Sequence, residues 1–117
     1  MIATAVRNRL APFSAALEER DPQALLAMFG PNAEVRFSNC ATAMQPPRSI
    51  TGKAAIAHRV FKFCAADQEI RVVDEVDHGN ELTIIAECHQ QDGSLFVLAI
   101  NATLVDGLVT RQFVVLV

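Results

Sequence analysis

Two carboxamides stand in the apolar C-terminal part of the sequence, where polar side chains are few. Asn101 lies near the middle of LFVLAINATLV, residues 95–105, and Gln112 lies in RQFVVLV, residues 111–117. A buried amide without a partner costs about 1–3 kcal/mol, so either neighbours or a bound molecule must satisfy it. An amide donates and accepts hydrogen bonds but has no useful pKa, so its chemistry is to orient or polarise a carbonyl group, not to carry protons.

The turns between the apolar runs indicate how these amides are positioned. DHGN, QDGS and VDGL separate four runs and predict four antiparallel strands joined in sequence. If Asp106 and Gly107 form a two-residue loop, Asn101 pairs with Gln112. If the Asp-Gly of QDGS turns in the same way, Ile84 lies on the other side of Asn101. A shift of one residue in either pairing would exchange the two faces of a strand.

This register predicts a pocket on one face of the sheet, in which a few polar groups converge within an apolar concavity. The predicted polar members are Asn101, Thr103, Thr110 and Gln112, and the apolar ones are Leu82, Ile84, Ala86, Cys88, Val97, Ala99, Val114 and Leu116. The opposite face is also mostly apolar, which predicts that a second subunit covers it and that the protein is a homodimer. That face would carry Thr83, Ile85, Glu87, His89, Phe96, Leu98, Ile100, Val109, Arg111, Phe113 and Val115.

Helical periodicity precedes the strands. An apolar stripe in residues 3–20, which includes Phe13 and Leu17, predicts an amphipathic helix. Asp21 and Pro22 fit the N-cap and first position of a second, short helix reaching Phe29, which Gly30 would end. Residues 33–37 alternate like a strand, and a loop with two prolines follows.

Residues 52–64 predict a third helix, with Ile56, Val60, Phe63 and Cys64 on one face. Helices followed by a meander of strands predict an α+β fold in which helices cover one face of a curved antiparallel sheet.

Composition limits the class of protein. A chain of 117 residues fits one domain, residues 1–117, and its net charge of −3 with scattered Lys and Arg argues against nucleic-acid binding. No apolar run reaches the ~18 residues of a membrane span. Cys40, Cys64 and Cys88 fit no zinc or redox spacing and predict reduced thiols in a cytoplasmic protein, with no metal or cofactor.

Three segments together carry a family resemblance: ALEERDPQALLAMFGPNAEVRF, PPRSITGKAAIAHRVF and the strands that end in VDGLVTRQFVVLV. Over nearly its whole length the chain resembles the nuclear transport factor 2-like superfamily, which includes ketosteroid isomerases and SnoaL-like polyketide cyclases. The resemblance implies a cone-shaped, cystatin-like fold with three N-terminal helices on a curved sheet. It also implies frequent dimerisation through the sheet and an apolar pocket inside the cone.

The resemblance also implies which positions would be catalytic. The oxyanion Tyr of the isomerases matches Phe13, their general-base Asp matches Phe37, and their oxyanion Asp matches Asn101. Two of these roles are therefore empty, and the third survives as an amide that can still donate a hydrogen bond.

We therefore expect a protein that binds a small apolar organic molecule, with no assigned reaction. The expected pocket residues are Asn101, Gln112, Phe13, Phe37, Cys88, Thr103 and Val97. Two alternatives remain: a non-catalytic dimerisation or interaction module whose pocket is a packed core, and an isomerase or cyclase-like enzyme with relocated catalytic groups. An open cavity of a few hundred Å³ lined by Asn101, Gln112, Phe13 and Phe37 would favour ligand binding, whereas complete filling of that space by Phe13 and Phe37 would favour the module. Cys40, expected near the pocket mouth, is the one thiol worth testing for reactivity.

Overall fold

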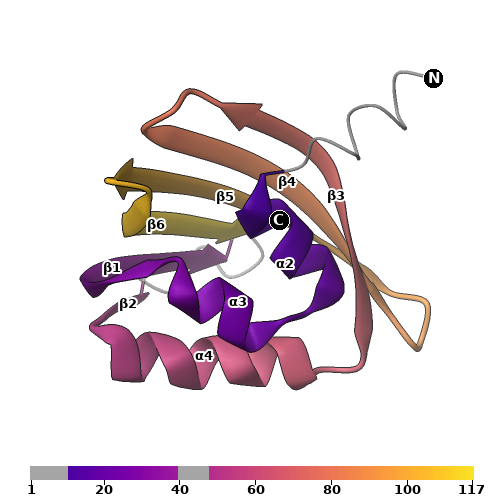
Figure 1. Cartoon of the computed structure of the whole chain (residues 1–117). Coiled ribbons are helices and arrows are strands. Elements are labelled where there is room, and N and C mark those ends of the chain that lie inside the picture. The colour runs from indigo at the N-terminus through magenta and orange to yellow at the C-terminus, as the bar shows by residue number, and fades with distance from the viewer. Residues whose placement is uncertain (1–10, 40–47) are drawn as a thin grey trace.

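The computed structural model describes residues 11–39 and 48–117. Within these ranges six strands form one curved sheet in the order β2-β1-β6-β5-β4-β3, and three helices cover one of its faces (Figure 1). This is the α+β layout that the sequence predicts. The helices are α2 (Pro12–Glu19), α3 (Pro22–Ala27) and α4 (Lys53–Ala65), and the strands are β1 (Phe29–Asn39), β2 (Arg48–Thr51), β3 (Gln68–Asp77), β4 (Glu81–Gln90), β5 (Leu95–Val105) and β6 (Leu108–Leu116). We call the helix-covered face the inner face and the opposite one the outer face.

The first two helices are separated by a tight junction. Arg20 ends α2 in the left-handed conformation, with φ of 52°. Asp21 then caps α3, since its side chain accepts a hydrogen bond from the Ala24 N–H at 3.1 Å, and Pro22 takes the first helical position, as expected. The expectation that this helix reaches Phe29 is wrong, because Phe29 is already the first residue of β1 and its buried side chain lies beside Val109 of β6.

The start of α2 is held by a distant strand. Its N-cap residue, Ala11, has no side chain that can cap the helix. Glu75 of β3 does so instead: its carboxylate accepts the Ala11 N–H at 3.0 Å and the hydroxyl of the fully buried Ser14. A carboxylate at a helix N-terminus is also favoured by the helix dipole. The N-terminal half of the expected first helix lies outside the described residues.

The third helix matches its prediction closely. It follows Gly52, whose φ of 91° favours glycine, and it buries Ile56 and Cys64 against the rest of the core. His58 on its other side is exposed, as expected from the periodicity. Its contacts are with α3, β1 and β2, so this helix closes the side of the inner face on which β2 lies.

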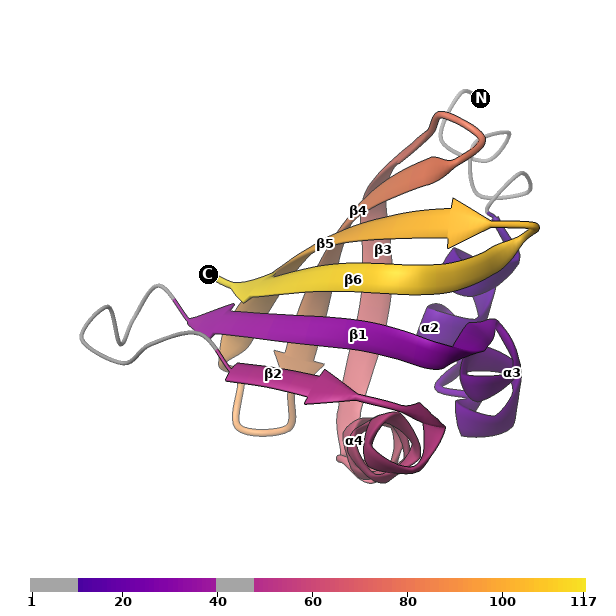
Figure 2. The ribbon, with the colours of Figure 1, turned by 90° about the vertical axis from the view of Figure 1, so that its left-hand side faces the viewer.

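The four C-terminal strands form the expected antiparallel meander, with β3, β4, β5 and β6 paired in sequence order. β1 adds to β6 in parallel, so the sheet is mixed, and the sequence did not predict β2, which pairs with β1 at the sheet edge. Figure 2 shows β1 and β6 running side by side in the same direction, with α4 seen end-on below β2.

The register between β4 and β5 differs by one residue from the expected one. The loop has three residues, because the Gln90 N–H bonds the Ser94 carbonyl oxygen at 2.9 Å and His89 pairs with Leu95. Asn101 therefore pairs with Thr83 and not with Ile84. The whole of β5 is consequently turned over relative to β4.

The β5–β6 hairpin has the expected two-residue loop, in which Val105 pairs with Leu108, but the pairing shifts farther along. Leu104 pairs with Val109 and Thr103 with Arg111, so Thr110 is an extra, bulged residue. Beyond the bulge Gln112 pairs with Ala102, and the predicted pairing of Asn101 with Gln112 is wrong.

These two shifts decide which side chains face the helices. Asn101, Thr103, Val97 and Ala99 lie on the outer face, not on the predicted pocket face, and Thr110 is exposed. Phe96, Leu98, Ile100 and Val109 were expected on the outer face but point inward. The inner face of the four-strand meander is therefore built from Ile70, Val72, Leu82, Ile84, Ala86, Cys88, Phe96, Leu98, Ile100, Ala102, Val109, Gln112, Val114 and Leu116.

Candidate functional site

A cavity of about 680 Å³ lies between the inner face and the helices. This volume is within the usual range of small-molecule sites, about 300–1,000 Å³. Its wall is mainly apolar and contains five of the chain's seven phenylalanines: Phe13, Phe29, Phe37, Phe63 and Phe96. Phe13 and Phe37 stand in the wall without filling the space, and Phe13 packs edge-on against Phe29, with ring centroids 6.1 Å apart. Aromatic side chains of the core thus border the cavity.

Gln112 is a buried amide in this wall. It lies in β6 between Val35 of β1 and Ala102 of β5, so three neighbouring strands fix its position. Only 7% of the residue is exposed, and its side-chain oxygen is fully buried with no hydrogen-bond partner in the described part of the chain. Rotation of the carboxamide about its last torsion exchanges the oxygen and the NH2 group, so the side chain can accept from a hydroxyl or donate to a carbonyl.

Three exposed cations border the cavity, and we call them the basic edge: Arg48, Arg59 and Lys62. The Arg59 guanidinium carbon lies 4.6 Å from the centroid of the Phe37 ring, a cation–π contact. Arg48 is the cross-strand partner of Phe37, so its side chain leaves the sheet on the same face. Phe37 therefore connects the cavity wall to the basic edge.

Two glutamines border the cavity where α4 meets β3. The Gln90 NH2 group donates to the Gln68 side-chain oxygen at 2.6 Å, and the Gln68 NH2 group donates to the Phe63 carbonyl oxygen at 3.3 Å. These bonds tie the end of α4 to the first residue of β3 and the last residue of β4. Both amides are thus engaged within the protein, unlike the oxygen of Gln112.

The described thiols are poor nucleophiles. Cys88 lies in the cavity wall, and burial raises its pKa above the usual value of a thiol. Burial also raises the pKa of Cys64, with a further contribution from the charge of Asp21 that the Arg20 cation partly offsets. Both side chains therefore act as small apolar groups at neutral pH. Cys40 lies outside the described residues.

The wall offers little acid–base chemistry. In residues 11–39 and 48–117 its titratable members are Arg48, Arg59, Lys62 and Cys88, with no Asp, Glu or His. Residues 1–10 and 40–47 contain none of these three residue types either. General acid–base catalysis most often uses His or a carboxylate with a pKa near the working pH. The arrangement is therefore suited to binding and orienting a molecule.

The predicted site residues divide into two groups. Gln112, Phe13, Phe37 and Cys88 are brought together in the cavity wall. Asn101, Thr103 and Val97 lie on the outer face because of the register shifts, so their placement in the pocket was wrong. Asn101 donates from its side-chain nitrogen to the Thr83 hydroxyl at 3.1 Å and to the Glu81 carboxylate at 3.2 Å, so the sheet itself satisfies this amide.

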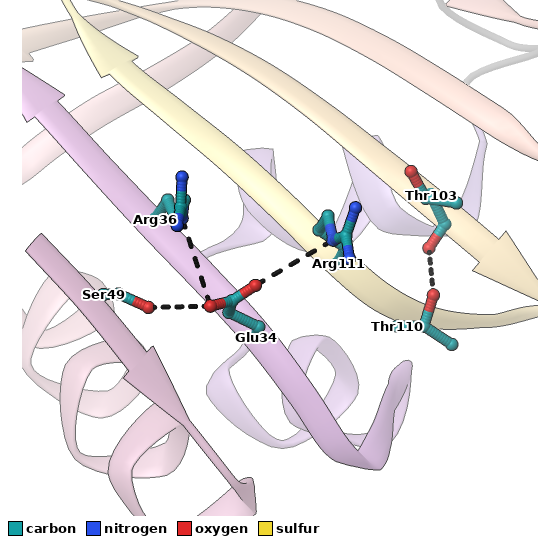
Figure 3. Close-up of polar contacts among 6 residues, drawn as sticks. All are labelled: Glu34, Arg36, Ser49, Thr103, Thr110 and Arg111. Carbon is teal, nitrogen blue, oxygen red and sulfur yellow. Dashed lines mark hydrogen bonds and ion pairs between the residues drawn. The ribbon is translucent and has the colours of Figure 1, made fainter. Parts of the chain in front are cut away.

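The outer face carries a polar group across β2, β1 and β6 (Figure 3). Glu34 accepts the Ser49 hydroxyl at 3.0 Å and lies 4.0 Å from the Arg36 side-chain Nε and 3.9 Å from that of Arg111. These contacts join three strands across their exposed side. They lie on the face of the sheet opposite the cavity.

The basic edge was not predicted as part of a site. Two of its members, Arg59 and Lys62, lie in α4, and the sequence pattern assigns them only to the polar side of an amphipathic helix. Arg48 lies in β2, which was expected to be loop. The spacing of three between Arg59 and Lys62 places them on neighbouring turns, but no sequence signal connects that side of the helix with Phe37.

Comparison with known structures identifies the fold. An NTF2-like protein of unknown function from Mesorhizobium loti superposes with a TM-score of 0.77 at 15% identity, covering 98% of this chain and 89% of that one. A protein of ketosteroid isomerase-like fold from Catenulispora acidiphila, solved in complex with trimethylamine, gives a TM-score of 0.63 at 16% identity, covering 88% and 80%. A de novo designed protein with a curved β-sheet gives a TM-score of 0.69 at 13% identity, covering 99% and 84%.

The chain therefore has the nuclear transport factor 2-like fold, as the resemblance predicted. At these identities the likeness concerns the fold alone, and a fold by itself does not specify an activity. No protein-family model and no curated protein matches the sequence. None of the helices in the described ranges is both long and apolar enough to cross a membrane.

Proposed function

We propose that this protein binds a small, largely apolar organic molecule in the cavity beneath its sheet. The observation that carries the proposal is the space of about 680 Å³ that Phe13 and Phe37 leave open in the core. Protein interiors are normally packed as densely as organic crystals, so an apolar concavity of this size is the usual form of a small-molecule site. The interaction-module alternative requires a fully packed core instead; Phe13 is itself part of the buried core, whereas Phe37 is only partly buried.

Gln112 is the polar contact in this proposal. Its side-chain oxygen has no hydrogen-bond partner among the described residues, and the neighbouring residues on the adjacent strands, Val35 and Ala102, are apolar. A ligand with one hydroxyl, amide or carbonyl group regains the hydrogen bond that the protein leaves unmade. Such a single bond orients a ligand whose affinity comes mainly from its apolar surface.

We propose binding without a proton-transfer reaction. By the family resemblance, the oxyanion Tyr and the general-base Asp of the isomerases correspond to Phe13 and Phe37, and the described part of the cavity wall has no carboxylate or imidazole. The trimethylamine in the Catenulispora acidiphila protein supports the idea that this type of fold accommodates small molecules. Its identity does not transfer to this chain, because trimethylamine is a cation in neutral water and the edge of this cavity is basic.

Fluorescence of the neutral probe N-phenyl-1-naphthylamine tests the proposal, because the probe brightens in apolar surroundings. We expect saturable binding by the wild type and a loss of about tenfold or more in affinity for Val114→Trp, which fills part of the cavity. Val76→Trp is the matched control, since Val76 is exposed on the outer face of β3. Absence of saturable binding, or equal binding by the two variants, would refute the proposal.

We also propose that the outer face forms a homodimer and that the protein acts in the cytoplasm, as the sequence suggested. An apolar strip supports the dimer: Ile85, Val97, Ala99, Phe113 and Val115 follow one another across β4, β5 and β6, and Phe113 is 39% exposed. Ala99 lies at the centre of the strip, so Ala99→Arg should convert the dimer to a monomer. Sedimentation equilibrium measures this change, and a monomeric wild type at micromolar concentration would contradict the dimer.

A further inference from the structure

We propose that the ligand is an organic anion, with an apolar body inside the cavity and a carboxylate or similar group at the basic edge. The inference rests on the proposed binding function and adds the chemical class of the ligand. It starts from a contrast in charge. The whole chain has a formal net charge of −3, whereas the described cavity wall contains Arg48, Arg59 and Lys62 and no acidic side chain.

The basic edge is assembled around one ring. Phe37 lies in the wall, and Arg59 stacks over it with its guanidinium carbon 4.6 Å from the ring centroid. Arg48 is paired with Phe37 across β1 and β2 and projects from the same face of the sheet. Arg48 thus leaves the sheet beside Phe37, and the guanidinium group of Arg59 contacts the ring of Phe37.

The third cation belongs to the same side of α4. Lys62 follows Arg59 by three residues, which are neighbouring positions on a helix surface, and it lines the cavity as well. All three side chains are exposed, so their charges remain hydrated. An exposed end of an apolar cavity with cations on its border is the arrangement that suits an amphipathic anion.

These charges lack partners within the described part of the chain. None of the three cations forms an ion pair there, and the one contact of Arg59 is with the Phe37 ring. Residues 1–10 and 40–47 contain no Asp or Glu that could neutralise them. By contrast, Arg36 and Arg111 on the outer face share the carboxylate of Glu34. The like charges at the cavity border create a positive potential that a carboxylate would relieve through charge-assisted hydrogen bonds.

The test uses two ligands of the same shape. The carboxylate 2-naphthoate and its neutral isostere 2-naphthamide each displace N-phenyl-1-naphthylamine from the wild type and from charge-neutralised variants. We expect naphthoate to bind about tenfold more tightly than naphthamide at low salt. Arg48→Gln combined with Lys62→Gln should reduce that preference to about threefold or less, because it weakens naphthoate binding more than naphthamide binding.

Lys53→Gln provides the matched control, because Lys53 is an exposed cation of the same helix that does not line the cavity. We expect it to leave the preference for naphthoate intact, and added salt to weaken naphthoate binding but not naphthamide binding. Thermal unfolding of each variant verifies that the fold is kept.

The outcomes separate the two proposals. If the neutral probe binds but naphthoate shows no preference, or if Lys53→Gln reduces the preference as much as the double variant does, the anion inference is wrong and ligand binding stands. If the neutral probe and both naphthalene derivatives fail to bind, the proposed function falls and the anion inference falls with it.

Discussion

Amide side chains on the two faces of the sheet differ in their hydrogen bonding. On the outer face Asn101 of β5 donates to Thr83 and Glu81 of the neighbouring strand. On the inner face Gln112 of β6, one strand away, has a buried side-chain oxygen with no partner in the described residues. The outer amide thus takes part in hydrogen bonds between strands, whereas the oxygen of the inner amide has no such bond within the described residues. A polar residue in an apolar strand therefore indicates a binding site only when it is known which face of the sheet its side chain occupies.

The difference in burial between the faces should give the largest effect. Ile84 is fully buried on the inner face, whereas the next residue, Ile85, is half-buried on the outer face. We expect Ile84→Ala to lower the free energy of unfolding by about 2–5 kcal/mol and Ile85→Ala by less than about 1.5 kcal/mol. Urea unfolding over a range of protein concentrations measures both and separates any effect of dimerisation. Equal losses in the monomer would contradict the assignment of the faces.

The burial of side chains between the inner face and the helices should slow the reactions of the two thiols that lie there. Burial raises the pKa of Cys88 and of Cys64, so less thiolate is present at a given pH than in a free cysteine. In a Cys40→Ser background we expect iodoacetamide to alkylate the folded protein at least about tenfold more slowly at about pH 8 than the protein in concentrated guanidinium. The rate should rise only at a higher pH than for a free thiol. Mass spectrometry follows the reaction, and equal rates in the folded and denatured states would show that the thiols are accessible.

The two amides should respond oppositely to the same substitution. Asn101→Leu removes two hydrogen bonds and should lower the free energy of unfolding by about 1 kcal/mol. Gln112→Leu removes an unsatisfied buried oxygen and should leave the stability of the unliganded protein unchanged or raise it by up to about 1 kcal/mol. Chemical unfolding of both variants gives the comparison. A larger loss for Gln112→Leu would mean that its amide is already satisfied without a ligand.

The outer charges should have the smallest effect. Glu34 lies at distances of 3.9 and 4.0 Å from two exposed arginines, and solvent screens such pairs. We expect Glu34→Gln to lower the free energy of unfolding by less than about 0.5 kcal/mol, with the loss vanishing in high salt. Glu69→Gln, which removes an exposed carboxylate elsewhere on the sheet, is the control. A loss above about 1 kcal/mol for Glu34→Gln would show that this polar group does more than pair strands.

Most of the fold could be predicted from short-range signals. Asp21 and Pro22 start α3 as capping chemistry requires, the stripe through Ile56 and Cys64 predicts α4, and three glycine-containing turns separate the meander strands. These signals depend on residues within one helical turn or one hairpin loop. β2 was missed because four residues with one half-buried side chain, Ile50, are too few to show a period.

The register of the strand pairs could not be predicted from the sequence. QDGS, for example, fits a hairpin loop of two or of three residues. In the structure Gly93 has φ of 89°, and Asp92 accepts the Ser94 N–H at 2.9 Å, which closes the three-residue form. The bulge at Thr110 has no sequence signal at all. The predicted register was wrong by one residue between β4 and β5 and again by one residue between β5 and β6. Each error inverts the faces, so β5 was inverted, whereas Cys88 of β4 and Gln112 of β6 were both placed on the correct face.

The shape of the cavity also depends on residues outside its wall, because Glu75 and Ser14, which do not line it, are joined by a hydrogen bond. Glu75 fixes the first turn of α2, and the same helix carries Phe13 and Leu17 into the wall. A change at this carboxylate would remove these bonds to α2 and, under the proposed function, would alter the ligand sizes that the cavity accepts with every wall residue unchanged. Ligand selectivity could thus change through substitution of the residue that holds the start of α2, and a comparison of wall residues alone would not detect this substitution.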